Sequence, residues 1–358
     1  MKKKIVALCL FMAAVATIHS KEAFAQQNDQ LYIPWRFYVS TPDGEVVGGF
    51  DPQYVTVLHW GGYGWIMICT HFGELWTNVS SLTNRLYGRT IVLDPGHGIG
   101  ADNTFMGYSE QAAMFALAMH LKPLLEAQGA QVFMTRKDYY EVHLTVRAAL
   151  INLWSLEAKL EIYENNPWRC DFEIEELKRL IGIMQSIVYD FSSFAPTYLN
   201  FPFDSRRQTR IHHDLEHIFN LQSHPAIADN WLGISLHSNA TGRPTNPEIR
   251  GADAYLMTNT NALSQYYFAN YSHVENIELF ADIILDNIEA LGIPRREVRP
   301  NNFLIIRETN IPMILIENGF HTNYYDRALL SCDYFLQALA HAYLEAILSY
   351  FDEISSPY

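Results

Sequence analysis

The stretch Thr90-Ile-Val-Leu-Asp-Pro-Gly-His-Gly98 decides how the rest of this chain is interpreted. An apolar, β-branched run ends in Asp-Pro-Gly and is followed at once by His97, a pattern typical of a buried strand with a polar side chain at its carboxyl end. Two later stretches repeat it: Leu232-Gly-Ile-Ser-Leu-His237 and Pro312-Met-Ile-Leu-Ile-Glu317. In open α/β sheets, ligands bind beyond the carboxyl ends of the strands. We therefore expect these three side chains at one edge of a sheet.

The residue types at this edge favour a metal site. A hydrolytic zinc ion needs three protein ligands and an open position for water. His97, Glu110 and His237 fit that count, so we predict that they bind Zn²⁺, with Glu317 outside the ligand set as general base. Taken singly, each residue also has an ordinary structural explanation, such as a hydrogen-bonded histidine or a glutamate at a helix start. We attribute the sharp turn at His97 to the conformational freedom of the glycines on either side of it.

Strand patterns alternate with amphipathic helix patterns after residue 88. The expected strands span residues 90–94, 131–135, 233–236, 251–257, 303–307 and 313–317, and the expected helices span 110–128, 144–153, 275–291 and 334–351. Alternation of this kind predicts an α/β fold, with a mixed, mostly parallel twisted sheet and helices on both of its faces.

The amino-terminal residues have the features of a signal peptide. Met1-Lys-Lys-Lys4 precedes an apolar run from Ile5 to Ile18, and Ala23-Phe24-Ala25 offers small residues for cleavage. About 14 apolar residues are fewer than the roughly 20 that span a bilayer, so we prefer cleavage near Ala25 to a membrane anchor. We predict an exported protein with no membrane span after cleavage, located in the periplasm or outside the cell at the cell wall.

The mature chain is expected to hold three parts. Residues 26–87 are rich in glycine, aromatic and β-branched residues and predict a small all-β module. Its run Gly64-Trp-Ile-Met-Ile weakly resembles bacterial SH3-like modules, some of which bind cell wall, but a small aromatic core explains it equally well. Residues 88–358 are the expected catalytic domain. It contains a predicted helical insertion at about 152–228, with helical patterns at 157–163, 173–189 and 212–221 and no strand pattern.

Net charge and cysteine content argue against a nucleic-acid partner and against a site built from cysteines. The net charge of −14 becomes −17 once the four lysines and one glutamate of residues 1–25 are removed, and such an acidic chain is repelled by nucleic acid. We expect no nucleic-acid partner. The cysteines of the mature chain (Cys69, Cys170 and Cys332) are odd in number and widely spaced, which argues against a disulfide framework and a cysteine zinc cluster. One disulfide remains an alternative, but we expect three buried thiols.

Several motifs, in order, resemble the zinc-dependent N-acetylmuramoyl-L-alanine amidases of bacterial cell-wall turnover. They are Ile91-Val-Leu-Asp-Pro-Gly-His-Gly98, Glu110, Val132-Phe-Met-Thr-Arg136, Arg147, Ile234-Ser-Leu-His-Ser-Asn-Ala240 and Pro312-Met-Ile-Leu-Ile-Glu-Asn-Gly-Phe-His-Thr-Asn323. The resemblance covers about residues 89–351 apart from the insertion. It implies zinc ligation by His97, Glu110 and His237, and a catalytic role for Glu317. The implied substrate is peptidoglycan, cleaved between N-acetylmuramic acid and the L-alanine of the stem peptide.

Two further residues match family positions, and two features depart from the family. Arg136 and Arg147 match, and we interpret both as structural ion-pair residues. The insertion replaces a short link, and either borders and gates the cleft or packs away from it. Asn318 and His321 replace small or aliphatic residues near Glu317. An activator protein is conceivable, but the sequence does not identify one.

Alternatives remain for a second site and for the function. His213-Asp-Leu-Glu-His217 fits the His-x-x-Glu-His pattern of inverted zincins, although a packing helix explains it more simply. The functional alternatives are a catalytically inactive or weakly active wall-binding protein, and another exported zinc amidohydrolase or carboxypeptidase.

Overall fold

The computed structural model describes residues 85–101, 103–166, 170–194, 197–201, 210–242, 246–260 and 266–355, together with the backbone of six strands between residues 30 and 78. The chain divides into two compact units, residues 1–89 with 121–131 and residues 90–120 with 132–358. The predicted signal peptide, residues 1–25, lies outside the described residues. None of the described helices has the length and apolar character needed to cross a membrane.

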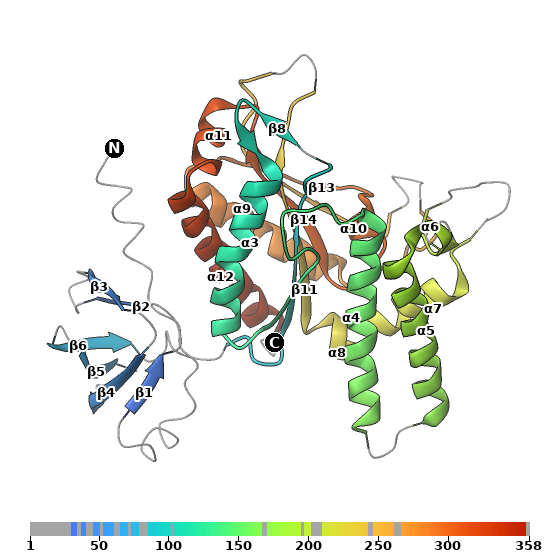
Figure 1. Cartoon of the computed structure of the whole chain (residues 1–358), viewed down its shortest axis with the longest axis horizontal. Helices are drawn as coiled ribbons and strands as arrows, with labels where there is room; N and C mark the ends of the chain where they lie inside the picture. Colours follow the sequence, from blue (N-terminus) through green and yellow to red (C-terminus); the bar gives the residue numbers. More distant parts are fainter. Residues whose placement is uncertain are drawn as a thin grey trace. The chain divides into compact units, whose positions relative to one another are not determined.

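The first unit contains antiparallel strands. β1 (Gln30–Ile33), β4 (Gln53–Trp60), β5 (Trp65–Thr70) and β6 (Gly73–Asn78) form a four-stranded sheet, and β2 (Phe37–Ser40) pairs with β3 (Val46–Phe50) (Figure 1). This segment is therefore β-rich, in line with its composition. Its likeness to SH3 modules stays a prediction.

The second unit is organised around a six-stranded sheet of order β10-β7-β11-β14-β12-β13. The strands are β10 (Gln131–Met134), β7 (Thr90–Pro95), β11 (Trp231–Asn239), β14 (Met313–Phe320), β12 (Ala252–Leu256) and β13 (Arg295–Pro300). β11 runs parallel to both β7 and β14, whereas β12 is antiparallel to β14 and parallel to β13. The predicted α/β class with a mixed, mostly parallel sheet is confirmed.

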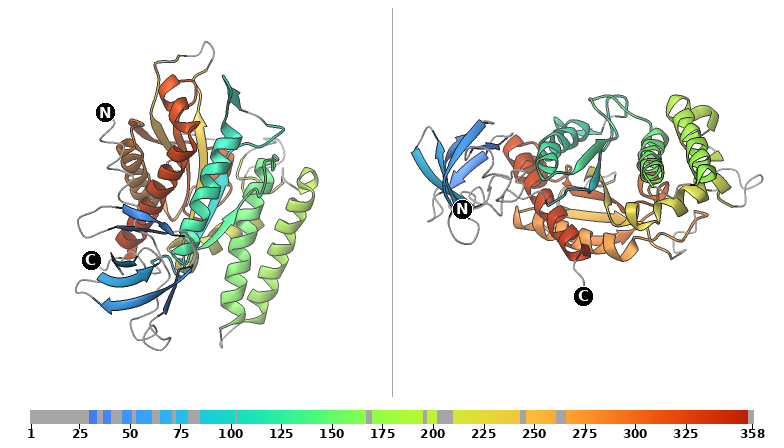
Figure 2. Two further views of the ribbon diagram at one scale, coloured as in Figure 1. Left: turned by 60° about the vertical axis from the view of Figure 1, so that its left-hand side comes forward. Right: turned by 90° about the horizontal axis from the view of Figure 1, so that it is seen from below.

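Helices cover both faces of this sheet (Figures 1 and 2). On one face, α4 (Leu144–Glu164), α5 (Asp171–Tyr189), α7 (His213–Gln222) and α10 (Leu304–Arg307) share one apolar core with Val92, Met313 and Leu315 of the strands. On the other face, α9 (Val274–Ala290) packs on β12, β13 and β14 and against α12 (Asp333–Ser355). The antiparallel pair of β8 (Thr104–Phe105) and β9 (Tyr108–Ser109) follows β7 and leads into α3 (Glu110–Ala127). The short helices are α6 (Phe191–Phe194), α8 (Pro225–Ala228) and α11 (Tyr324–Leu330).

Two strand assignments differ from the sequence prediction. The expected strand at 303–307 is wrong, because Leu304–Arg307 forms the helical turn α10. Ile305 and Ile306 are both buried in the apolar core, and a short buried apolar run is compatible with either a strand or a helical turn. β12 pairs with β14 on one side and with the edge strand β13 on the other, and β13 is not among the expected strands. Its sequence, Arg-Arg-Glu-Val-Arg-Pro, carries the charged residues typical of a sheet edge instead of an apolar pattern.

The predicted helices lie close to the observed ones, with one difference. The expected helix at 144–153 continues to Glu164, so that it and the following helical pattern form a single element, α4. The expectation of buried thiols is wrong for Cys170 and Cys332, which are free and exposed. The side chain of Cys69 lies outside the described residues.

Candidate metal centre

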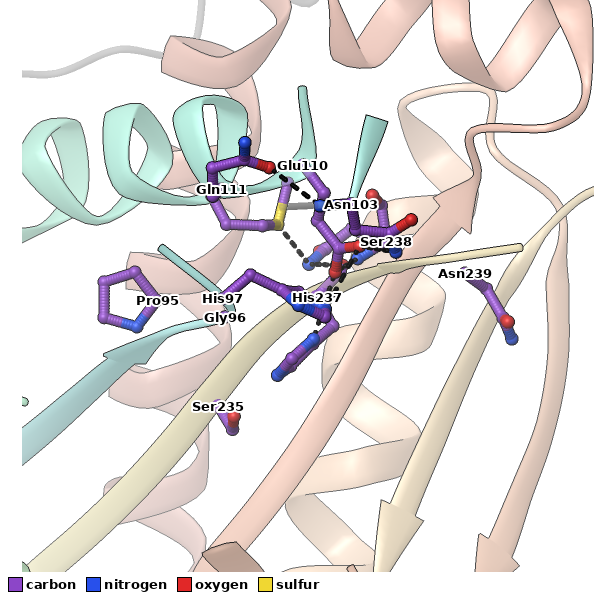
Figure 3. Close-up of polar contacts among 12 residues, drawn as sticks. Pro95, Gly96, His97, Asn103, Glu110, Gln111, Ser235, His237, Ser238 and Asn239 are labelled. Carbon is purple, nitrogen blue, oxygen red and sulfur yellow. Dashed lines mark hydrogen bonds and ion pairs between the residues drawn. The ribbon is translucent and has the colours of Figure 1, made fainter. Parts of the chain in front are cut away.

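The structure brings three of the predicted residues together at the carboxyl ends of β7 and β11. His97, Glu110 and His237 each offer one ligand atom, and these atoms lie within 4.8 Å of one another. Figure 3 shows both imidazoles beside the Glu110 carboxylate. The carboxylate Oε1 lies 3.0 Å from His237 Nδ1, and Oε2 lies 3.4 Å from His97 Nε2. Two imidazole nitrogens and a carboxylate can hold a divalent cation such as zinc.

Other groups fix the orientation of these ligand atoms. The Ser238 amide donates to Glu110 Oε1 at 2.9 Å, and the Asn103 side-chain amide donates to Oε2 at 2.5 Å. His97 Nδ1 lies 3.1 Å from the Ala101 carbonyl, so in the tautomer that donates to this oxygen its Nε2 lone pair faces Glu110. The site is therefore ordered by contacts that do not involve a metal.

The turn at His97 has a different physical basis from the one expected. The left-handed conformation falls on His97 itself, whose φ is 56°, and neither flanking glycine has a positive φ. Glycine is required at 96 and 98 for space. A Cβ at 96 would lie 2.4 Å from His237 Cε1, and a Cβ at 98 would lie 2.4 Å from the Glu141 Cα. A non-glycine residue in the left-handed region costs about 1–3 kcal/mol, which the surrounding contacts must offset.

Two buried arginines supply those contacts. Arg147 Nη1 pairs with Asp94 Oδ1 at 3.0 Å, and its Nη2 donates to the His97 carbonyl at 2.6 Å. The predicted ion-pair role is confirmed for Arg147. Arg136 instead donates to the backbone carbonyls of Pro95 and Gly96. Burial, and then the nearby Arg147 charge, lower the pKa of Arg136 to about 10.

The carboxylate of Asp94 completes the base of the turn. It accepts hydrogen bonds from Thr135 Oγ1 at 2.5 Å and Ser235 Oγ at 2.6 Å. Burial alone would raise its pKa, but the Arg147 charge and these two hydroxyls hold the pKa below the usual range. Asp94 is therefore a structural anion that joins β7 to β11, to the end of β10 and to α4.

Glu317 stands beside this group. It is level with His237 in the parallel pair β11–β14 and level with Asp253 in the antiparallel pair β12–β14. Its Oε2 atom is buried and has no hydrogen-bond partner among the described residues. Burial raises the pKa of Glu317 to about 8; the positive charge of His237 opposes that shift, whereas Glu110 and Asp253 add to it. A buried carboxylate oxygen that has no partner among the described residues, level with His237 on the neighbouring strand, suits a proton acceptor.

Glu110 and His237 influence each other strongly. Burial disfavours the charge on each, but their mutual hydrogen bond and attraction outweigh it. The pKa of Glu110 is therefore lowered and that of His237 is raised. An ionised Glu110 is what a cation at this position requires.

A second group of three residues has ligand spacing but a different environment. His212, His213 and Asp214 at the start of α7 lie within the same distance limit. Asp214 is already paired, because Arg179 Nη2 lies 2.6 Å from its Oδ1. His212 Nδ1 accepts the Asp214 amide at the helix start. His217 of the inverted-zincin pattern is not part of this group, and its Nδ1 lies 3.5 Å from Glu176 Oε1. These pairings favour the interpretation of α7 as a packing helix.

Several residues around the site were not found from the sequence. Asn103, Asp253, Tyr108 and the hydroxyl of Ser238 have no spacing or motif that indicates a role. Ser238 follows His237 directly, which is the one signal that could have drawn attention to it.

Comparison with known proteins gives a consistent result. A family model described as N-acetylmuramoyl-L-alanine amidase matches residues 91–166 and 207–349, more than half of the chain, and leaves out residues 167–206. An uncharacterized cell wall amidase of Bacillus anthracis is 33% identical over 104 residues, which are 27% of this chain and 19% of that protein. An endolysin of Bacillus phage SPP1 is 31% identical over 116 residues, 32% of this chain and 38% of the endolysin.

The chain thus spans less than two fifths of the length of these curated relatives. Among solved structures, an N-acetylmuramoyl-L-alanine amidase from Clostridium difficile 630 aligns with a TM-score of 0.45 and 19% identity, covering 74% of this chain and 97% of that one.

Proposed function

Because the chain belongs to the N-acetylmuramoyl-L-alanine amidase family, we propose that it is a zinc-dependent peptidoglycan hydrolase that cleaves the amide bond between N-acetylmuramic acid and the L-alanine of the stem peptide. The observation that carries this proposal is the convergence of His97, Glu110 and His237, with the open Oε2 of Glu317 on the neighbouring strand. The names of the relatives, a cell wall amidase and an endolysin, agree with a substrate in the wall.

His97, Glu110 and His237 would hold the zinc ion. When bound, zinc supplies Lewis-acid activation of water and of the scissile carbonyl. The protein's contribution is to present an ionised Glu110, oriented through both of its oxygens, between two imidazoles. A set of three protein ligands leaves a coordination position for the reactants, as catalytic sites require.

Glu317 would act as general base and then as general acid. Its Oε2 accepts a proton from the attacking water and returns that proton to the leaving nitrogen of L-alanine. Burial raises the pKa of Glu317 to about 8, so the metal-free site favours the protonated form at neutral pH. A divalent cation beside it favours the carboxylate, because the added positive charge lowers the pKa. A bound divalent cation would therefore increase the fraction of Glu317 that is ionised and able to accept a proton.

The site of action follows from the substrate and from the sequence of residues 1–25. A basic start, an apolar run and small residues before a cleavage point direct a chain out of the cytoplasm. We infer that the protein works in the periplasm or at the cell wall. Fractionation of cells that make the tagged full chain, followed by amino-terminal sequencing of the product, tests both export and cleavage near Ala25.

Product analysis tests the proposed reaction. Purified protein is incubated with peptidoglycan, with and without a chelator, and the soluble products are identified by mass spectrometry. We expect stem peptides with a free L-alanine amine and glycan with free lactyl carboxylates, loss of both on chelation, and recovery with zinc. Release of single terminal amino acids would indicate a carboxypeptidase. Sedimentation with the wall without any product would indicate a binding protein.

A further inference from the structure

A closed loop of contacts lies behind the candidate ligand Glu110. The Tyr108 hydroxyl is 2.9 Å from Ser238 Oγ, and the Ser238 amide donates to Glu110 Oε1 at 2.9 Å. Tyr108 lies in β9 (Tyr108–Ser109), which leads directly into Glu110 at the start of α3. The loop therefore runs from Tyr108 along the backbone to Glu110, across to Ser238, and back to the Tyr108 hydroxyl. This closed path restrains Glu110 twice, at its backbone through the link to Tyr108 and at its carboxylate through the Ser238 amide.

His321 is the third member of this arrangement. Its Nδ1 lies 3.0 Å from Ser238 Oγ, and its ring stacks on the Tyr108 ring at 5.3 Å between centroids. One assignment gives both hydroxyl protons an acceptor: Tyr108 donates to Ser238 Oγ, and Ser238 donates to His321 Nδ1. The exposed fractions of Tyr108, Ser238 and His321 are 4%, 2% and 1%, so water does not compete for these bonds.

The contacts of the three residues span separate parts of the sheet edge. Tyr108 precedes α3, Ser238 follows the ligand His237 on β11, and His321 follows the last residue of β14. The hydrogen bonds therefore join the segment that carries Glu110 to the two strands that carry His237 and Glu317. None of these three side chains belongs to the ligand set or serves as the base.

We propose that Tyr108, Ser238 and His321 are positioning residues that fix Glu110 for metal binding. This inference rests on the proposed function, since it takes His97, Glu110 and His237 as the zinc ligands. Groups that orient ligands typically change metal affinity by 10–100-fold when they are removed, because the free ligand then samples orientations that do not bind. His321 departs from the residues usual in the family, so this support is built from the chain's own residues.

Zinc affinity of the metal-stripped full chain tests the proposal. The variants are Tyr108→Phe, which keeps the ring, and Ser238→Ala, which keeps the amide that bonds Glu110. His321→Phe is the third variant and keeps an aromatic ring beside Tyr108. Competition with a chromophoric chelator is expected to show a zinc Kd that is about 10-fold weaker in each variant. The double variant Tyr108→Phe with Ser238→Ala is expected to lose little more than the single variants, because both break the same bond.

The matched control is Tyr271→Phe. Tyr271 is another buried tyrosine, and its hydroxyl donates to the Arg307 carbonyl at 2.9 Å, outside this arrangement. We expect its zinc Kd to stay within twofold of the wild type. Equal zinc affinity in wild type, Tyr108→Phe and Ser238→Ala would overturn the proposal, and so would an equal loss in Tyr271→Phe.

Failure of the proposed function gives a different result. A wild-type protein that binds zinc but releases no stem peptide from peptidoglycan contradicts the reaction, while the three zinc affinities still decide the role of the positioning residues. A wild-type protein that binds no zinc overturns this inference together with the metal site.

Discussion

The candidate metal centre and a second polar cluster in the same unit differ in whether their buried polar atoms have hydrogen-bond partners. The second cluster, here named the Gln222 network, comprises Asn152, Ser155, Gln222, Glu308 and Asn310. Its side-chain oxygens and nitrogens are all hydrogen-bonded within the described residues. At the metal centre, by contrast, Glu317 Oε2 is buried and has no hydrogen-bond partner in the part of the chain that the structure describes. The ligand atoms of His97, Glu110 and His237 lie within 4.8 Å of one another.

This contrast separates polar groups that stabilise the fold from polar groups that are available for function. A buried polar group without a partner costs about 1–3 kcal/mol, so an arrangement that keeps one needs another reason to exist. The Gln222 network joins α4, the end of α7 and the chain before β14, and its satisfied bonds fix one relative position of these elements. The predicted insertion at 152–228 supplies Asn152 and Gln222, which favours packing over gating for this part of it.

The largest effect is expected from Glu317→Gln. The amide keeps the shape of the side chain but cannot take the proton, so peptidoglycan hydrolysis should fall by about 10²–10⁴-fold. Zinc content should stay the same, because Glu317 is outside the ligand set. Release of stem peptides and metal analysis of the same preparation measure the two quantities.

Glu297→Gln is the control for that substitution. Glu297 lies on the edge strand β13, its side chain is 66% exposed, and it pairs with Arg299. Exposed ion pairs contribute little, so rate and stability should be unchanged. Wild-type hydrolysis by Glu317→Gln would contradict the assignment of the base.

Gln222→Ala tests whether the Gln222 network stabilises the fold. Gln222 Nε2 donates to Asn152 Oδ1 and Ser155 Oγ at 2.8 Å each, and its Oε1 accepts the Asn310 amide at 2.7 Å. Loss of these bonds leaves buried groups unpaired and should lower the free energy of unfolding by about 2–4 kcal/mol. Urea denaturation measures the loss, and the zinc Kd should stay within twofold.

Gln185→Ala provides the matched substitution on an exposed part of α5. A surface change of this kind is usually within about 0.5 kcal/mol of neutral. If Gln222→Ala were equally neutral in urea, the Gln222 network would not stabilise the fold. If it weakened zinc binding tenfold, the two regions would be coupled.

His273 extends the comparison to a buried group that is neither in the network nor in the site. Both ring nitrogens lack partners among the described residues, and burial lowers the pKa of His273 to about 4. The unfolded chain takes up the proton near pH 6.5, before the folded chain does. The stability contribution is therefore complete above pH 6.5 and is lost as the pH falls toward 4.

The expected size of this loss is about 2 kcal/mol between pH 7 and pH 4.5. His273→Leu removes the titrating group, so its free energy of unfolding should fall less than that of the wild type over the same interval. Thermal or urea unfolding at the two pH values measures the difference. An equal loss in both proteins would show that other groups control the acid sensitivity.

The sequence could predict β7, β11 and β14, because each contains an apolar run that leads to one of the candidate residues His97, His237 and Glu317. It could not predict β13, whose edge position is set by pairing with β12 and not by an apolar pattern. Short apolar runs are ambiguous between strand and helix, which is why Leu304–Arg307 was assigned incorrectly.

The residues that surround the ligands could not be predicted from the sequence, because their contacts join positions that are far apart in the chain. Tyr108 and Ser238 are 130 positions apart in the chain, and their hydrogen bond exists only once α3 and β11 are in place. The turn at His97 is a second example. The sequence indicates that Gly96 and Gly98 matter, but the conformational freedom expected of them is not the reason. Their lack of a side chain makes room for His237 and Glu141, and this requirement arises from tertiary packing.

The smallest effects are expected from two glycine substitutions. One adds a methyl group where the site has no space for it, and the other adds it where the space is open. In Gly96→Ala the new Cβ would lie 2.4 Å from His237 Cε1, so the imidazole must move, and the zinc Kd should weaken about 10-fold. Gly182→Ala on α5 meets nothing within 4 Å, and alanine should stabilise the helix by about 0.5–1 kcal/mol with no change in zinc Kd. Chelator competition and urea unfolding of both variants measure these changes. Unchanged zinc affinity in Gly96→Ala would mean that the position of the His237 ring does not control metal binding.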